Sequence, residues 1–313
     1  MPISRRQLSV ERGFGENQPS TSVRLAKLAV SLLIQCPVGD VALGPKVRGN
    51  VWGAVVRFVV IARPRTGSNA LTAALSRQPD ILCNGEIFSP DRVGVRWDKK
   101  STSPEALLEL RELRERDSDA FMERVFATNY GCAHVGFKIF DEHNALMLKK
   151  LIEDESIRKI ILFRRNVLAQ YSSVKLAMTT GDWVAGEKKS TGQAQPPGKV
   201  LFKKKRFWTY CKKYLRFYAD TIRQIEDARQ SFHLINYDEV NNQRLFRALV
   251  RFIGADFRRV PIAGGPLKQN SSNIVSRFSN QDDVKEFLEA SGLQHWAFEG
   301  EVAFSLRKLG STE

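Results

Sequence analysis

Short apolar runs alternate along this chain with segments in which apolar residues recur every three or four positions. The runs are typical of buried strands; they are Val55–Ala62, Ile81–Asn84, His134–Phe140, Ile157–Phe163 and Phe232–Tyr237. The other segments predict helices; these are Asn69–Gln78, Pro104–Phe126 (one or two helices), Asn144–Glu153, a helix starting near Val167, Phe207–Ile225, Gln243–Ile253 and Asp282–Ala290. Alternating strands and helices favour βαβ units, so we predict an α/β fold of three α/β/α layers with a central, mostly parallel sheet.

The length of 313 residues suits one large domain with an appendage. We expect the domain to cover residues 51–313, and residues 1–50 to be an appended segment whose polar first part is poorly ordered. Within the appendage, Val23–Ile34 fits an amphipathic helix or a weak signal-like segment. Its apolar part, Leu28–Ile34, is short for a signal peptide, so a helix lying on the domain, or a start codon assigned too early, is favoured over export.

The stretch from Val55 to Glu86 joins a strand, a turn that contains glycine, and a helix. Backbone N–H groups at the start of a helix have no partner within it and lie at the positive end of its dipole, so they can bind anions. Thr66 and Ser68 add hydroxyl donors, and Arg65 adds a charged fork that suits a phosphate or sulfonate. Taken alone, the same residues also fit an ordinary turn and helix cap.

This loop differs from the Walker loop of ATPases, whose lysine reaches the terminal phosphates and whose Ser or Thr binds magnesium. No lysine stands between Arg57 and Lys99, and Arg65 lies inside the loop instead. No carboxylate after a strand is a clear magnesium ligand. A P-loop-type phosphotransferase or nucleotide kinase is therefore an alternative that these residues disfavour.

Five segments, in order along the chain, resemble the superfamily of sulfotransferases that use 3′-phosphoadenosine-5′-phosphosulfate (PAPS). The resemblance is to its bacterial carbohydrate branch, which includes nodulation-factor and trehalose sulfotransferases. The first segment is the loop Arg65–Asn69, which is similar to the family pattern R-S/T-G-S-S/T after the first strand. The others are Asn84–Phe88, Val135–Ile139, Ile160–Ser173, and Ile235–Val240 with the later Lys268–Asn270. The resemblance covers about Val55 to Trp296 and implies a P-loop-like domain.

The resemblance implies that PAPS is the co-substrate and 3′,5′-diphosphoadenosine (PAP) the product. The residues implied at the 5′-phosphate are Arg65, Thr66, Gly67, Ser68 and Asn69. Those implied at the 3′-phosphate are Arg164 with Ser173, or Arg165 with Ser172 in a second register, and Lys268 in a late basic loop. By themselves these arginines would suit carboxylate partners, and Lys268 a surface loop. Asn69 stands where the family has Thr or Ser, and we expect it to cap the helix and to alter affinity without abolishing function.

The resemblance also implies sulfuryl transfer to a hydroxyl of a carbohydrate or glycolipid. Glu86 would be the general base, Arg65 would stabilise negative charge that builds on the 5′-phosphate, and Lys138 would neutralise the sulfonate. A solvated glutamate is a weak base, so we expect partial burial beside Phe88 to raise the pKa of Glu86. The alternatives are a loop carboxylate paired with an arginine for Glu86, a surface position for Lys138, and a domain that binds nucleotide without transferring.

Two later segments bear on partners. Ala177–Val200 is rich in Gly, Pro and Ser and is long for a connector, so we interpret it as a loop covering the acceptor site, with Trp183 as its sugar-contacting residue. The next segment, around Lys203–Tyr218, interleaves basic and aromatic residues, as proteins that bind single-stranded nucleic acid do. Its aromatic residues also follow the buried stripe of an amphipathic helix with solvent-exposed lysines, and this interpretation is favoured.

The net charge of +15 indicates anionic partners without identifying them. A non-enzymatic protein that binds nucleic acid or acidic lipid is therefore the second alternative; for a sulfotransferase we expect no nucleic acid, and peripheral membrane contact stays open. The four cysteines show no C-x-x-C spacing and the four histidines no ligand spacing. We therefore predict no metal, and a reducing, cytoplasmic location that includes the inner membrane face.

Overall fold

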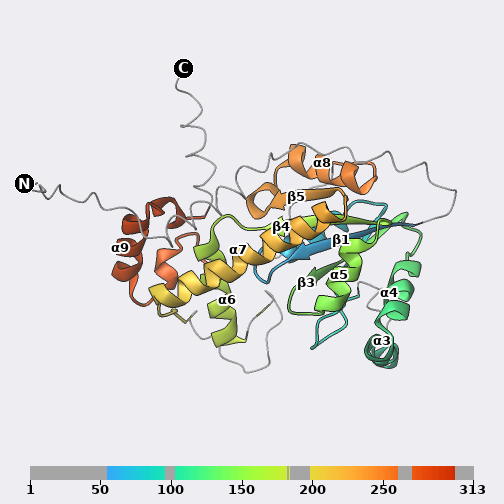
Figure 1. Ribbon diagram of the computed structural model, residues 1–313, viewed down its shortest axis with the longest axis horizontal. Helices are drawn as coiled ribbons and strands as arrows, with labels where there is room; N and C mark the ends of the chain where they lie inside the picture. The colour runs from blue at the N-terminus through green and yellow to red at the C-terminus, as the bar shows by residue number, and fades with distance from the viewer. Residues whose placement is uncertain (1–54, 96–102, 182, 184–197, 260–269, 300–313) are drawn as a thin grey trace, which may run out of the picture.

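The computed structural model describes residues 55–95, 103–181, 183, 198–259 and 270–299 (Figure 1). Its centre is a sheet of five strands in the order β2-β3-β1-β4-β5, and every neighbouring pair is parallel. The strands are β1 Val56–Ala62, β2 Ile81–Glu86, β3 His134–Phe140, β4 Ile157–Phe163 and β5 Phe232–Asn236. The predictions for residues 1–50 and for Lys268 lie outside the described residues.

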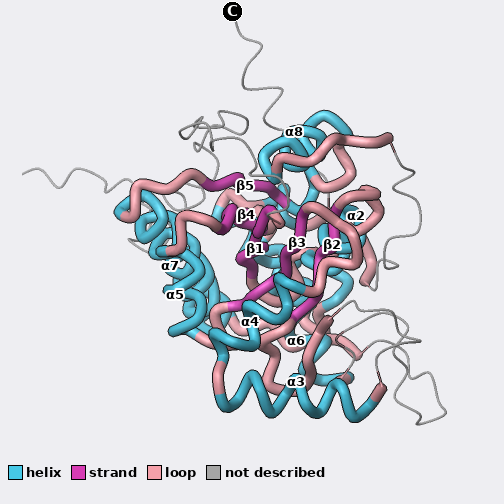
Figure 2. Tube along the Cα trace, turned by 90° about the vertical axis from the view of Figure 1, so that its right-hand side faces the viewer, coloured by secondary structure: helices cyan, strands magenta, loops and turns pink. Residues whose placement is uncertain are grey.

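Helices cover both faces of the sheet, which confirms the predicted three-layer α/β/α fold (Figures 1 and 2). On one face α2 and α8 pack on alternate residues of β1, such as Phe58 and Val60. On the other face the remaining residues, such as Val59 and Ile61, share a core cluster with α3–α7. Helix α9 joins this cluster through Phe287, which packs on Phe207 of α7. The helices are α2 Ser68–Leu75, α3 Pro104–Arg116, α4 Ser118–Ala127, α5 Ala145–Glu153, α6 Val167–Thr180, α7 Lys204–Asp227, α8 Gln243–Ile253 and α9 Gln281–Ser291. Three 3₁₀ turns, η1 Tyr237–Glu239, η2 Val275–Arg277 and η3 Gln294–Trp296, complete the described elements.

Several helix ends follow directly from local side chains. Asn144, Asn166 and Asn242 accept backbone N–H bonds at the starts of α5, α6 and α8. Gly181 adopts the left-handed conformation that ends α6, with φ 76°. The first residues of the predicted loop at Ala177 are therefore helical, because the helix continues to the first residue that can adopt a left-handed cap.

The long helix α7 packs its apolar stripe on the sheet (Figure 1). Its buried residues include Phe207, Cys211, Tyr214 and Tyr218, as predicted. The hydroxyl of Tyr214 accepts from the backbone N–H of Arg164 at 2.8 Å, so α7 directly supports the residue that follows β4. The lysines predicted on the wet face are exposed. Within the described residues, no helix is long and apolar enough to cross a membrane.

Candidate functional site

The candidate site lies at the carboxyl ends of β1, β2 and β4, around the loop that joins β1 to α2. Lys138 approaches this loop from the β3 side, with its Nζ 3.3 Å from Ser68 Oγ. Arg164 approaches from the β4 side and donates from Nη1 to the carbonyl oxygen of Arg65 at 3.2 Å. Ligands of open parallel sheets bind at this edge, where the strands on either side of β1 lead to opposite halves of the fold.

The loop has a backbone that favours glycine at Gly67. Gly67 is the N-cap of α2 and has a φ of 86°. A Cβ atom at this position would lie 2.1 Å from Cδ2 of Tyr237, so the aromatic ring closes over the loop. Arg65 also has a positive φ, 64°, and Thr66 donates its hydroxyl to the carbonyl oxygen of Arg63 at 2.7 Å. The Thr66 hydroxyl therefore holds the turn together.

Asn69 does not cap α2, which corrects the expectation from the sequence. Gly67 occupies the N-cap position without a side-chain hydrogen bond, and Asn69 is already the second residue of the helix. Its Oδ1 accepts a hydrogen bond from Lys138 Nζ. The amide of Asn69 thus connects the start of α2 to the buried Lys138 of β3, the strand beside β1 in the sheet.

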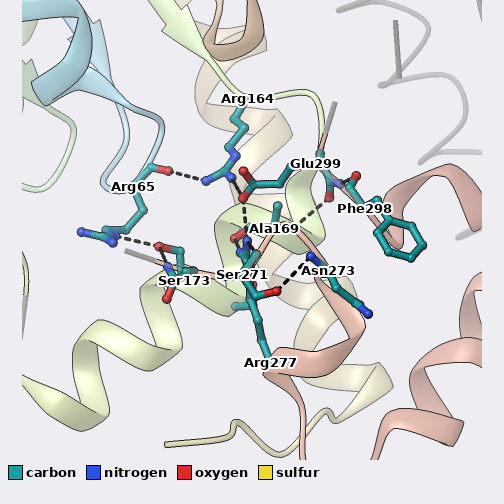
Figure 3. Close-up of polar contacts among 12 residues, drawn as sticks. Arg65, Arg164, Ala169, Ser173, Ser271, Asn273, Arg277, Phe298 and Glu299 are labelled. Carbon is teal, nitrogen blue, oxygen red and sulfur yellow. Dashed lines mark hydrogen bonds and ion pairs between the residues drawn. The ribbon is translucent and has the colours of Figure 1, made fainter. Parts of the chain in front are cut away.

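The side chain of Arg65 points toward α6 (Figure 3). Its Nε donates to Ser173 Oγ at 2.8 Å, and its Nη1 donates to the carbonyl oxygen of Trp183 at 2.6 Å. Burial lowers the pKa of Arg65, and the nearby charges of Arg164 and Arg277 lower it further. Three guanidinium groups therefore lie close together at this side of the loop.

The two doubled positions, Arg164/Arg165 and Ser172/Ser173, have different surroundings. Arg164 contacts the Arg65 carbonyl and lies 4.7 Å from the ring centroid of Tyr237. Arg165 points away and donates to Glu239 Oε1 at 2.8 Å. Likewise Ser173 accepts from Arg65, whereas Ser172 donates to the carbonyl oxygen of Ala169 at 3.0 Å. The register with Arg164 and Ser173 is the one whose side chains both contact the loop.

Arg277 and Glu299 belong to the same cluster, and the sequence analysis did not identify them. Arg277 donates from Nη1 to Ser172 Oγ at 3.2 Å and from Nη2 to Glu299 Oε1 at 2.6 Å. The same Oε1 atom accepts from Nη2 of Arg164 (Figure 3). The side chains of Arg277 and Glu299 are only 3% and 6% exposed. Neither residue stands in a local pattern that distinguishes it from other charged residues of the chain.

On the other side of the loop, Glu86 and Lys138 form a buried ion pair of 2.8 Å. Glu86 is the last residue of β2 and lies opposite Lys138, which is inside β3. The side chain of Lys138 is 2% exposed, so the surface alternative for this lysine is wrong. Its Nζ faces Glu86 Oε1, Ser68 Oγ and Asn69 Oδ1, which matches the three donors of an ammonium group.

The pKa of Glu86 is lower than the ordinary value, contrary to the expectation from the sequence. Burial would raise it, but the charge and hydrogen bond of Lys138, with smaller contributions from Arg92 and His143, outweigh burial. For Lys138 the balance is opposite: burial lowers its pKa more than Glu86 raises it. We infer that Glu86 and Lys138 are both ionised, because all three N–H donors of the Lys138 ammonium group have acceptors. Glu86 is thus a carboxylate at neutral pH.

Curated proteins and a solved structure resemble this chain. No family model matches the chain. Nodulation protein H of Rhizobium meliloti strain 1021 is 28% identical over 190 residues, 58% of this chain and 70% of that protein. Nodulation protein H of Rhizobium tropici is 29% identical over 232 residues, 71% of this chain and 85% of that protein. A solved sulfotransferase from Alicyclobacillus acidocaldarius is 16% identical, with a TM-score of 0.42, over 77% of this chain and 96% of that chain.

No group of His, Cys, Asp and Glu side chains with the arrangement of a metal site occurs among the described residues. The two nodulation protein H sequences, taken with the five motifs, support the relationship to the sulfotransferase superfamily.

Proposed function

We infer that this chain is a sulfotransferase related to the nodulation protein H proteins, and we propose that it moves the sulfuryl group of PAPS to a hydroxyl of a carbohydrate or glycolipid. The observation that carries the proposal is the position of one anion-binding loop between two different clusters. One cluster is cationic and suits a nucleotide phosphate. The other contains a carboxylate beside a buried ammonium and suits proton and sulfuryl transfer.

The nucleotide would lie along the loop. The first N–H groups of α2 and the guanidinium of Arg65 would bind the 5′-phosphate, since both present donors to an anion. Arg164, with Ser173, would bind the 3′-phosphate. In support, Arg164 and Ser173 both contact Arg65, and Arg164 is held under the ring of Tyr237. Lys268 stays a proposal from the resemblance alone.

In the transfer step the acceptor oxygen attacks the sulfur in line with the bond to the 5′-phosphate oxygen. The new O–S bond forms while the old S–O bond breaks, and PAP leaves with that electron pair. The proton of the acceptor hydroxyl passes to Glu86. Lys138 would stabilise negative charge on the sulfonate oxygens, and its charge also keeps Glu86 able to accept a proton at neutral pH.

The acceptor class is proposed from the resemblance to the carbohydrate branch. Trp183 supports it: the residue is 45% exposed and its carbonyl oxygen accepts a hydrogen bond from Arg65, so its backbone lies beside the loop. A location in the cytoplasm, with peripheral contact to the inner membrane face, is proposed from the cysteine spacing and the net charge of +15. That location is part of the proposal.

The experiment is thermal stabilisation by PAP, compared with AMP, ATP and magnesium ATP, because a ligand that binds the folded state raises its stability. Arg164→Ala should abolish the PAP shift. Arg165→Ala is the matched control, since the neighbouring arginine binds Glu239 and should leave the shift intact. A stronger shift with magnesium ATP would instead favour a kinase. No shift with any nucleotide would favour a binder of nucleic acid or acidic lipid.

A further inference from the structure

We propose that the carboxylate of Glu299 occupies the binding position of the 3′-phosphate and competes with it, so that this residue weakens PAP binding and speeds its departure after transfer. The inference rests on the proposed function, because it presupposes that Arg164 binds the 3′-phosphate. It adds a role for a residue outside the five motifs.

The geometry is that of an anion held between two guanidinium groups. Glu299 Oε1 accepts from Nη2 of Arg164 and from Nη2 of Arg277, and the two arginines approach it from different elements (Figure 3). Arg164 follows β4, whereas Arg277 ends the turn η2. Arginine forks bind carboxylate and phosphate oxygens alike, so a position between two of them suits either anion.

The charges of the cluster also favour a phosphate. Arg164 and Arg277 are close enough to Arg65 to lower its pKa through charge repulsion. Glu299 supplies one negative charge to these three positive ones. A phosphate monoester carries a charge of about −1.5 to −2 at neutral pH and has three acceptor oxygens. It therefore satisfies the arginines better than a carboxylate does, which makes displacement of Glu299 favourable when PAP arrives.

The backbone around Glu299 is anchored, so the carboxylate returns to the same place. Asn166 Nδ2 donates to the carbonyl oxygens of Trp296 and Phe298 at 3.1 Å and 3.3 Å. The backbone N–H of Glu299 donates to the carbonyl oxygen of Ser272 at 2.9 Å. Trp296 is itself buried. The anchored backbone keeps the competing carboxylate at a high local concentration beside the arginines.

Kinetically, the carboxylate can replace the leaving phosphate on the same guanidinium groups. Both arginines then keep an anionic partner while PAP leaves, and this lowers the free energy needed for product release. AMP lacks the 3′-phosphate and does not need this position. The competition therefore acts on PAP and PAPS and leaves AMP unaffected.

The test compares dissociation constants for PAP and AMP, by titration calorimetry, in the wild type, Glu299→Gln and Glu299→Asp. Glutamine removes the charge, and aspartate is one methylene too short to reach both arginines. We expect both variants to bind PAP about tenfold more tightly, within the usual range of coupling between two ligands, with AMP unchanged. Glu239→Gln is the matched control, because Glu239 pairs with the adjacent Arg165 at similar burial.

Thermal unfolding supplies a second readout if Glu299→Gln is unstable. The variant should melt below the wild type without nucleotide, and saturating PAP should close that gap, because the phosphate then occupies the arginines in both proteins. Equal or weaker PAP binding in both variants, with Arg164-dependent binding in the wild type, would overturn the inference alone. Tighter binding of AMP as well as PAP would also overturn it. No PAP binding in any of these proteins would overturn the proposed function and the inference together.

Discussion

Replacing Lys138 with Met removes the cation beside Glu86 and keeps an unbranched side chain in the buried position. In the variant, Glu86 remains at the end of β2 with burial acting on it and without the ammonium group at 2.8 Å. Arg92, 3.9 Å away and 44% exposed, compensates only weakly. The substitution therefore creates a partly buried carboxylate without its main counter-charge.

Removing one partner of a buried ion pair costs about 3–5 kcal/mol. The Glu86 side chain is 15% exposed, so water reaches part of it and we expect the lower end, about 3 kcal/mol at neutral pH. For a domain of this size, 1 kcal/mol corresponds to about 2–4 °C, so Tm should fall by about 6–12 °C.

The free energy of unfolding that Lys138→Met loses should be larger at high pH than at low pH. In the wild type the pKa of Glu86 is below its ordinary value of 4.5, so its stabilising effect is present above that value and is lost as the pH falls through the depressed pKa. In Lys138→Met, burial raises the pKa of Glu86 above the ordinary value. The variant then gains stability on acidification, so the difference between the proteins is largest near about pH 8 and shrinks toward about pH 5.

The assay is urea unfolding at these two pH values for the wild type, Lys138→Met, Glu86→Gln and the double variant. We expect the double variant to lose less than the sum of the single variants, by about 1 kcal/mol or more, because it contains neither charge. A cost of Lys138→Met that is equal at both pH values, together with additive single effects, would refute the reasoning about the ion pair.

Three further outcomes are expected. Gly67→Ala should lower PAP affinity and destabilise the protein by more than about 1–2 kcal/mol in urea unfolding, because a clash with the Tyr237 ring adds to the backbone cost of a positive φ. Gly131→Ala is the control: its φ is 81° and no atom lies within 4 Å of the added Cβ, so it should show the backbone cost alone. Glu86→Gln should reduce kcat by about 10²–10⁴-fold in a radiolabelled sulfate-transfer assay and leave PAP affinity nearly unchanged. Trp183→Ala should raise the acceptor KM and leave the PAPS KM within about twofold, as expected for an aromatic contact with the acceptor; a change confined to PAPS would contradict that role.

Much of the fold could be predicted because its signals are local. The strands β3 and β4 and the helix α8 begin and end at the predicted residues. Buried parallel strands are continuous apolar runs, and α8 lies between the Asn242 cap and the left-handed Gly254. The turn between β1 and α2 was recognisable for the same reason, since its residues are contiguous.

The parts that could not be predicted depend on residues far apart in the chain. The pKa of Glu86 follows from Lys138 on the neighbouring strand, and burial beside Phe88 alone gave the wrong direction. The predicted capping by Asn69 failed because Gly67, two residues earlier, occupies the N-cap position, and because the amide oxygen of Asn69 accepts from Lys138. Arg277 and Glu299 come together with Arg164 only through the packing of η2 and the segment after η3.

The central place of β1 has a consequence for how such enzymes diversify. Its loop touches Arg164 and Tyr237 from the half formed by β4 and β5, and Lys138 from the half formed by β2 and β3. On the proposed function, the first half recognises the donor, and the second half, with Glu86, handles the acceptor. A chimaera that exchanges the segment from β2 to β3 should inherit a new acceptor range with an unaltered donor site, and divergence between relatives should accumulate in that same segment.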